Sequence, residues 1–200
     1  MENASLHTYV GKPSVRASSA GSSSDAARGT GSCRLFLAML VVCLPAWLQA
    51  DEIWNQFRGP DGSGISSNSR VSLVVDPQTD SVWRTEIPGL GWSSPVTDGE
   101  RIWLTAARVT EATEAERAER LANVTLAQMK DVAGSVDMIA ICLNANSGKI
   151  LQTVELGPVA EPKPIHPMNG YASPTPVIAG DRVGVDFGQY GTWCLDNVTG

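Results

Sequence analysis

Few residues in this 200-residue chain could carry out chemistry. Beyond residue 50 there is one histidine, His166, and histidine is the side chain most suited to proton transfer near neutral pH. A serine–histidine–aspartate triad could include His166, but the sequence lacks the G-x-S-x-G turn that presents the serine of many hydrolases. His166 stands among prolines, so we predict a loop residue hydrogen-bonded to the backbone. The alternative is contact with a ligand at the rim of a loop.

The cysteines also form no recognisable site. Cys142 and Cys194 are far apart in the sequence, whereas a zinc site needs a cluster of Cys and His ligands. The C-x-x-C-H pattern of covalent haem attachment is absent. Both cysteines lie between apolar neighbours, so we expect two buried thiols. The residues therefore predict no catalytic, no cofactor-binding and no metal-binding position.

The strands that would have to position a site can be recognised from internal repeats in the sequence. SPVTDGERIWL matches TPVIAGDRVGV, ICLNANSG matches WCLDNVTG, and VWRTEI matches LQTVEL. The matched pairs are 94–104 with 175–185 at an offset of 81 residues, 141–148 with 193–200 at 52, and 82–87 with 151–156 at 69. Several of these segments alternate apolar and polar residues between Gly, Asp or Asn turns, which is typical of β-strands in tight hairpins.

The spacing of the repeats predicts an all-β fold. With the insertions removed, the period is about 40 residues, the length of a four-stranded β-propeller blade. Because propellers close with about 4–8 blades, we expect an incomplete propeller containing about the first two blades. The unequal offsets place a blade insertion at 108–136. Thr113 and Glu116 have capping-box spacing there, so we predict a helical insertion at about 110–132.

The first fifty residues have a different composition. A Ser/Gly-rich stretch ends at Arg34 and is followed by the uncharged segment Leu35–Ala50, which is typical of a secretory signal. That segment is shorter than the roughly 20 residues that span a bilayer, although an uncleaved anchor is the alternative. The expected domains are a signal peptide with a long Ser/Gly-rich n-region at 1–50, an N-terminal extended segment at 51–80 and truncated propeller repeats at 81–200.

The net charge and the predicted export signal limit the classes of partner. The chain has 15 Lys and Arg against 21 Asp and Glu, a formal net charge of −6. An acidic chain offers no electrostatic footprint for a phosphate backbone, so we expect no nucleic-acid partner. The leader predicts export to the periplasm or cell surface, with membrane contact only through an uncleaved leader. An unknown protein or small molecule is the expected partner.

A long proline-rich loop, Gly157–Tyr171, is the best candidate for ligand contact. Long loops on a rigid scaffold often carry function. The candidate residues at its rim are His166, Asn169 and Trp92.

The repeat resembles that of the pyrroloquinoline-quinone-like (PQQ-like) β-propellers, known from the quinoprotein alcohol dehydrogenases. The shared pattern is SPV-x-x-G-[DE]-R-[IV] followed by CL-[DN]-x-x-[ST]-G-K, and the opening WNQFRGPDGSGIS is similar to exported propellers of planctomycete-type bacteria. The resemblance covers about Trp54–Gly200. It implies a funnel of four-stranded blades, usually seven or eight.

The resemblance implies two possible functions. In one branch of the family, quinone-dependent alcohol and sugar dehydrogenases hold the quinone (PQQ) and calcium on the propeller axis. The other branch consists of non-catalytic scaffold propellers. The dehydrogenase branch has adjacent cysteines and a docking tryptophan, whereas here the cysteines are separated and Gln152 stands at a docking position. We therefore expect an exported, non-catalytic binding or scaffold module without a cofactor. The alternative is a PQQ-dependent quinoprotein oxidoreductase with its active site in further blades.

Overall fold

The structure is a computed structural model that describes residues 7–11, 53–66 and 76–200. These residues are mostly β-sheet, and all the strand pairs are antiparallel. The strands are β1 (His7–Gly11), β2 (Ser81–Glu86), β3 (Val96–Thr97), β4 (Arg101–Glu111), β5 (Ala133–Asn144), β6 (Ile150–Val159), β7 (Val177–Ala179), β8 (Arg182–Asp186) and β9 (Thr192–Asp196). The helices are α1 (Glu114–Leu121) and two 3₁₀ turns, η1 (Ala127–Met129) and η2 (Gly188–Tyr190).

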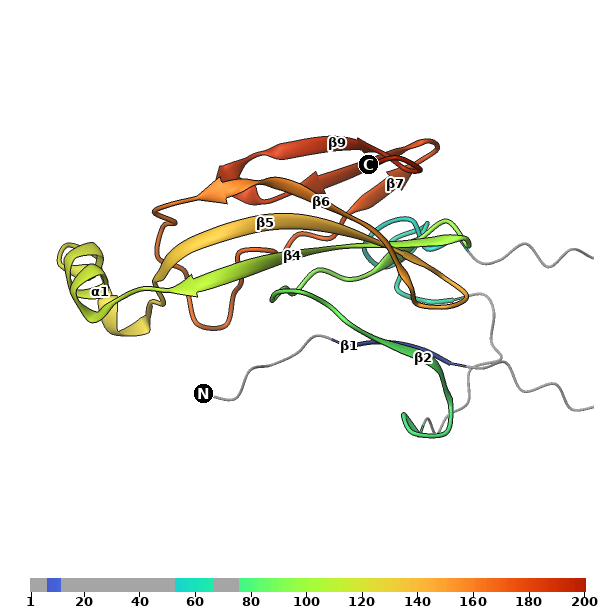
Figure 1. The fold of residues 1–200 in the computed structure, drawn as a ribbon, viewed down its shortest axis with the longest axis horizontal. Coiled ribbons are helices and arrows are strands. Elements are labelled where there is room, and N and C mark those ends of the chain that lie inside the picture. The colour runs from blue at the N-terminus through green and yellow to red at the C-terminus, as the bar shows by residue number, and fades with distance from the viewer. Residues whose placement is uncertain (1–6, 12–52, 67–75) are drawn as a thin grey trace, which may run out of the picture.

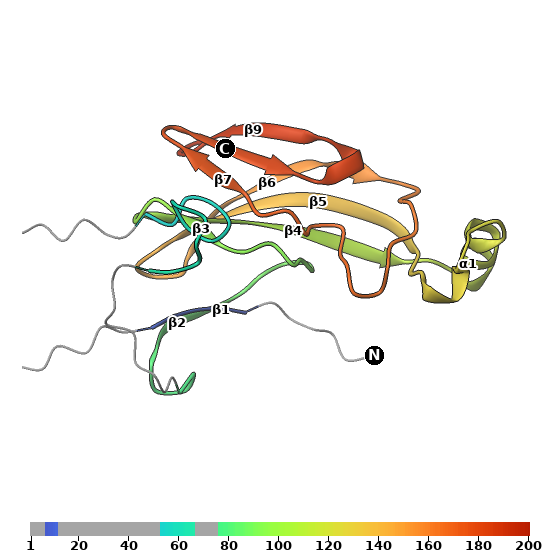
Figure 2. The same cartoon turned by 180° about the vertical axis from the view of Figure 1, so that it is seen from behind.

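The strands form three sheets that lie one above another (Figure 1). A two-stranded sheet, β1-β2, lies on one side, the four-stranded sheet β3-β4-β5-β6 is in the middle, and the three-stranded sheet β7-β8-β9 lies on the other side. The view from behind shows the same order of layers, with α1 projecting from the far end of β4 and β5 (Figure 2). The middle sheet is therefore enclosed on both faces.

Hydrophobic residues on both faces of the middle sheet form the core. One face contributes Trp103, Ala140 and Cys142 to a cluster that continues into the β7-β8-β9 sheet. The other face contributes a second cluster, which contains Ile139 and Ile141 and packs against Trp83 of β2. Burial of both faces explains why β5 reads as a nearly continuous apolar run.

The repeats found in the sequence have the same strand register. Trp103 pairs with Cys142 in the middle sheet, and Gly184 pairs with Cys194 in the next sheet. Offsets of 81 and 52 residues relate these two pairs, as in the sequence alignment. The alignment of the two hairpins is thus confirmed, whereas closure into a propeller goes beyond the residues described here.

The prediction of a helix across 110–132 was wrong in extent. The helix covers only Glu114–Leu121, with the expected capping box between Thr113 and Glu116. The strands β4 and β5 run on into the insertion, where Val109 pairs with Val136 and β6 still pairs with β5. Only the last pairs, such as Thr110 with Ser135, form a two-stranded ribbon. The ladder continues because backbone pairing satisfies N–H and C=O groups that an isolated turn would leave open.

A turn with a glycine packs the middle sheet and the β7-β8-β9 sheet each against the sheet that precedes it in the sequence. Gly148, with φ +68°, lies against the ring of Trp83, leaving no room for a Cβ atom. Nε1 of Trp83 also donates to the carbonyl of Ala145, at 2.9 Å. The equivalent Gly200 lies against β6, where an added Cβ would be 2.8 Å from Cγ2 of Val154 and 3.2 Å from Oε1 of Gln152. Trp83 and Gln152 are related by the 69-residue offset, so the structure assigns the docking role to Trp83 in the first copy.

A chain of side-chain hydrogen bonds joins the middle sheet to β7-β8-β9. Nε1 of Trp103 donates to Oδ1 of Asn197 at 2.8 Å, and Nδ2 of Asn197 donates to Asp98 at 2.8 Å. Burial works against ionisation of Asp98, but hydrogen bonds from the Arg101 backbone and from Asn197 hold the pKa of Asp98 below its usual value. The hydrogen bond between Trp103 and Asn197 is buried. It satisfies the indole N–H, and burial of that group without a partner would be energetically unfavourable.

The N-terminal residues that are described lie against the sheets. In the segment expected to be extended, residues 53–66 are rich in turns. Trp54 forms a backbone bridge with Thr97, and Asn55 exchanges hydrogen bonds with the backbone of Ile178. Residues 7–11 of the predicted leader form β1 and pair with β2. The predicted cleavage position after Ala50 lies outside the described residues.

We expect Gly148→Ala to destabilise the fold more than Gly180→Ala. Both glycines have positive φ, +68° and +61°, but a Cβ at Gly180 meets nothing within 4 Å. An L residue in this conformation costs about 1–2 kcal/mol, and overpacking against Trp83 adds about 1–3 kcal/mol at Gly148 only. The two free energies of unfolding are measured by urea titration. Equal losses of unfolding free energy in the two variants would show that the packing of Gly148 on Trp83 does not constrain the fold.

Candidate functional site

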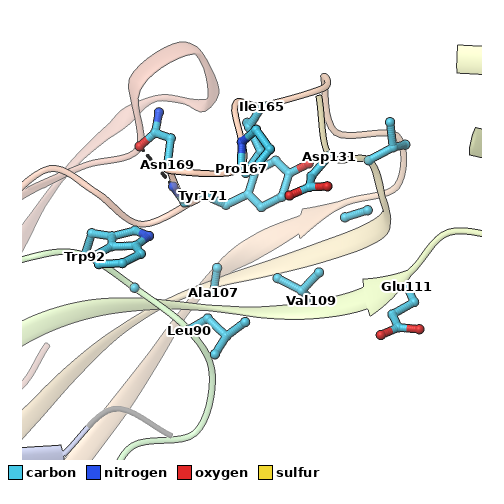
Figure 3. A pocket seen from close by; sticks show the side chains of 14 residues that line it. Leu90, Trp92, Ala107, Val109, Glu111, Asp131, Ile165, Pro167, Asn169 and Tyr171 are labelled. Atoms are coloured by element: carbon cyan, nitrogen blue, oxygen red, sulfur yellow. Dashed lines mark hydrogen bonds between the residues drawn. The ribbon is translucent and has the colours of Figure 1, made fainter. Parts of the chain in front are cut away.

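The main cavity of the described residues lies where the loop at 165–171 passes over the middle sheet (Figure 3). Its volume is about 560 Å³, within the range of small-molecule sites. The lining residues are Leu90, Gly91, Trp92, Ala107, Val109, Glu111, Asp131, Val132, Ala133, Ile165, Pro167, Asn169, Gly170 and Tyr171. Most are apolar, and they come from β4, β5 and three connecting segments.

Backbone bridges hold the walls of the cavity together. Leu90 and Ala107 exchange two hydrogen bonds of 2.8 Å, which fixes the segment after β2 on β4. Asp131 and Ile165 form a second bridge, with distances of 2.8 and 3.0 Å, which fixes the proline-rich loop on the insertion. The cavity is therefore framed by main-chain pairing.

Trp92 forms one end of the cavity (Figure 3). Its side chain is 67% exposed, which is unusual for so large an apolar group. Its backbone N–H donates to Ala172 at 2.8 Å, and a Cβ atom added at Gly170 would lie 2.7 Å from its Cδ1. Glycine at position 170 thus allows the loop to touch the indole ring.

Two carboxylates lie toward the end of the cavity away from Trp92 (Figure 3). Asp131 accepts a contact from Arg117 at 3.4 Å, so its charge is partly compensated. For Glu111, no ion pair is found within the described part of the chain. An apolar cavity with an aromatic ring at one end and an unpaired carboxylate at the other favours a ligand with a positive charge.

Tyr171 forms part of the wall and is largely buried. Burial raises the pKa of its hydroxyl, so the group stays protonated across the physiological range. The hydroxyl donates to the carbonyl of Lys163 at 3.2 Å. Tyr171 also lines a smaller cavity of about 270 Å³ beside η2, so the loop at 165–171 separates this cavity from the larger one.

The structure brings two of the three rim candidates together. Trp92 and Asn169 both line the cavity, whereas His166 is not among its lining residues. Nδ1 of His166 accepts the backbone N–H of Met168 at 3.1 Å, as expected for a loop histidine. Asn169 also supports its own loop, because its Oδ1 accepts from the N–H of Gly170 at 2.9 Å.

The sequence analysis missed Val109, Glu111 and Asp131. It assigned them to a helical insertion outside the sheets, whereas β4 extends through Glu111 and the cavity forms beneath that extension. The sequence carried little signal for this extension, because Val109 is the single apolar residue among residues 108–111 and the buried run of β4 ends before it.

The chain matches no known family model, and no curated protein shows significant sequence similarity to it. Within the described residues, no group of three or more His, Cys, Asp or Glu is placed to hold a metal ion. No helix of the same residues is long and apolar enough to cross a membrane.

The expectation of two buried thiols is half wrong. Cys142 is buried, and burial raises the pKa of its thiol to about 11. Cys194 is exposed, although it occupies the equivalent register position. The difference arises because the β7-β8-β9 sheet packs on the face of β5 that carries Cys142, whereas no described sheet packs on the face of β9 that carries Cys194.

We expect a thiol reagent at pH 8 to label Cys194 at least about 100-fold faster than Cys142. A thiol with a pKa of about 11 is ionised in roughly one molecule in a thousand at that pH, and reagents also cannot reach it when it is buried. Mass spectrometry of digested protein resolves the individual cysteines, and labelling in urea provides the control. Comparable rates in the folded protein would contradict the structure.

Proposed function

We propose that the chain contains blades of an exported β-propeller and acts as a non-catalytic binding module. The two hairpins of identical register and the face-to-face stacking of the sheets support the propeller. The resemblance to PQQ-like repeats supports the same fold. Export rests on the leader, in which an apolar segment follows Arg34.

The cavity is the observation that carries the binding function. It is mainly apolar, it is framed by paired backbone, and it offers an exposed aromatic ring. Its ligand is a small organic cation with an apolar body. The apolar part lies between Leu90, Val109 and Tyr171, and the cationic group is oriented by Glu111.

A probe series tests the ligand class. Hexyltrimethylammonium provides an apolar chain and a cation, hexanol removes the charge, and hexanoate reverses it. We expect hexyltrimethylammonium to bind more tightly than hexanol and hexanoate to bind most weakly. Isothermal titration calorimetry measures the three affinities. Equal binding of the cation and the anion would contradict the proposed ligand class.

The variant Glu111→Gln tests the role of the carboxylate. It keeps the shape of the side chain and removes its charge. Because Glu111 is exposed, we expect the affinity for hexyltrimethylammonium to fall about 2- to 5-fold, the size of a solvent-exposed ion pair. Hexanol binding should not change. Glu119→Gln on α1 removes the same charge away from the cavity lining and is the matched control. An equal effect of the two variants would overturn the assignment of Glu111.

A further inference from the structure

One edge of β4 is paired along only part of its length. The N–H and C=O of Thr105 both bond to the hydroxyl of Ser93 at 3.0 Å, and those of Ala107 bond to Leu90 at 2.8 Å. Alternation along an antiparallel ladder turns the N–H and C=O of Val109 toward the same edge, away from β5. Among the described residues, neither of these two groups has a hydrogen-bond partner.

The segment that pairs with this edge leaves it before Val109. Leu90 runs antiparallel to β4, so Pro88 stands where the next pairing residue would be. Proline has no N–H to donate. The preceding Ile87 belongs to the core cluster on the face of the middle sheet away from the cavity. Val109, which is 39% exposed, is therefore an open position within the sheet edge.

The open position faces the main cavity. The side chains of Val109 and Glu111 both line it and follow each other along β4 (Figure 3). Residues directly opposite on paired strands point to the same face of a sheet, and so do residues two apart on one strand. A chain paired with Val109 would thus place one side chain in the cavity and another beside Glu111.

We propose that the ligand of the main cavity is a short extended peptide that adds to the edge of β4 at Val109. This inference rests on the proposed function and narrows its organic cation to a peptide. The peptide backbone exchanges two hydrogen bonds with the N–H and C=O of Val109. An apolar side chain enters the cavity between Leu90 and Tyr171, and a lysine of the peptide lies opposite the carboxylate of Glu111.

The neighbouring pairs set the direction of the peptide. β4 is antiparallel both to β5 and to Leu90, so we assign the peptide the same antiparallel direction. Its lysine therefore comes two residues before its apolar residue. Leu90 already occupies the edge opposite Ala107, so the peptide ends or turns away after the apolar residue. The motif is a lysine, any residue and a leucine at the end of an extended segment.

Three peptides test the backbone pairing on the unaltered protein. Acetyl-lysyl-alanyl-leucinamide carries the motif. Methylation of the leucine nitrogen removes the N–H that donates to the carbonyl of Val109, whereas methylation of the alanine nitrogen removes an N–H that points away from β4. In calorimetry we expect the first methylation to weaken binding about 3- to 10-fold, the size of one hydrogen bond, and the second to leave it unchanged. Equal affinities of the two methylated peptides, or no binding of the parent peptide, would overturn the proposal.

Hydrogen exchange separates this inference from the proposed function. Acetyl-lysyl-alanyl-leucinamide should slow the exchange of the Val109 amide at least about 10-fold in NMR spectra. Hexyltrimethylammonium has no backbone to pair and should not slow it. The amide of Arg108 faces β5 and is the internal control.

The two proposals can therefore fail independently. If hexyltrimethylammonium binds with the expected charge preference but the peptide leaves the exchange of Val109 unchanged, the peptide proposal is overturned and the small-cation function stands. If the peptide protects Val109 but the three hexyl probes bind equally, the pairing is supported and the cationic ligand class is overturned.

Discussion

The structure depends on the docking of a positive-φ glycine turn onto the preceding sheet. Gly148 lies against Trp83 and Gly200 lies against Val154 and Gln152, and neither site has room for a larger residue. Sheets pack about 10 Å apart, so a turn that touches the neighbouring sheet directly fixes both spacing and register. The contact depends on an αL conformation, which glycine adopts at little cost. The order of the three layers follows from repeating this contact.

The two docking contacts are unequal. Trp83 fills its site and donates from Nε1 to the carbonyl of Ala145. At the equivalent position, the buried Nε2 of Gln152 has no hydrogen-bond partner among the described residues. The second junction gains instead from the buried bond between Trp103 and Asn197. Successive sheets are thus joined by the same backbone turn but by different polar contacts.

The strand pairing could be predicted from sequence because it depends on local signals. Alternating residues and the Asp98-Gly99 turn define a hairpin, and its repetition gave the register that pairs Cys194 with Gly184. The cavity could not be predicted, because Glu111 reaches it only through the extension of β4 by long-range pairing with β5. The exposure of Cys194 was missed for a similar reason, since the burial of a strand residue depends on the sheet that packs on its face and not on the local sequence.

A double-mutant cycle between Trp103→Phe and Asn197→Ala measures the junction between the middle sheet and β7-β8-β9 most directly. The phenylalanine keeps most of the ring and removes the N–H that donates to Oδ1 of Asn197 at 2.8 Å. Because Asn197 also binds Asp98, only the coupling term isolates the bond between the sheets. We predict a coupling energy of about 1–2 kcal/mol in urea unfolding. Strictly additive effects would show that the two sheets are not joined as described.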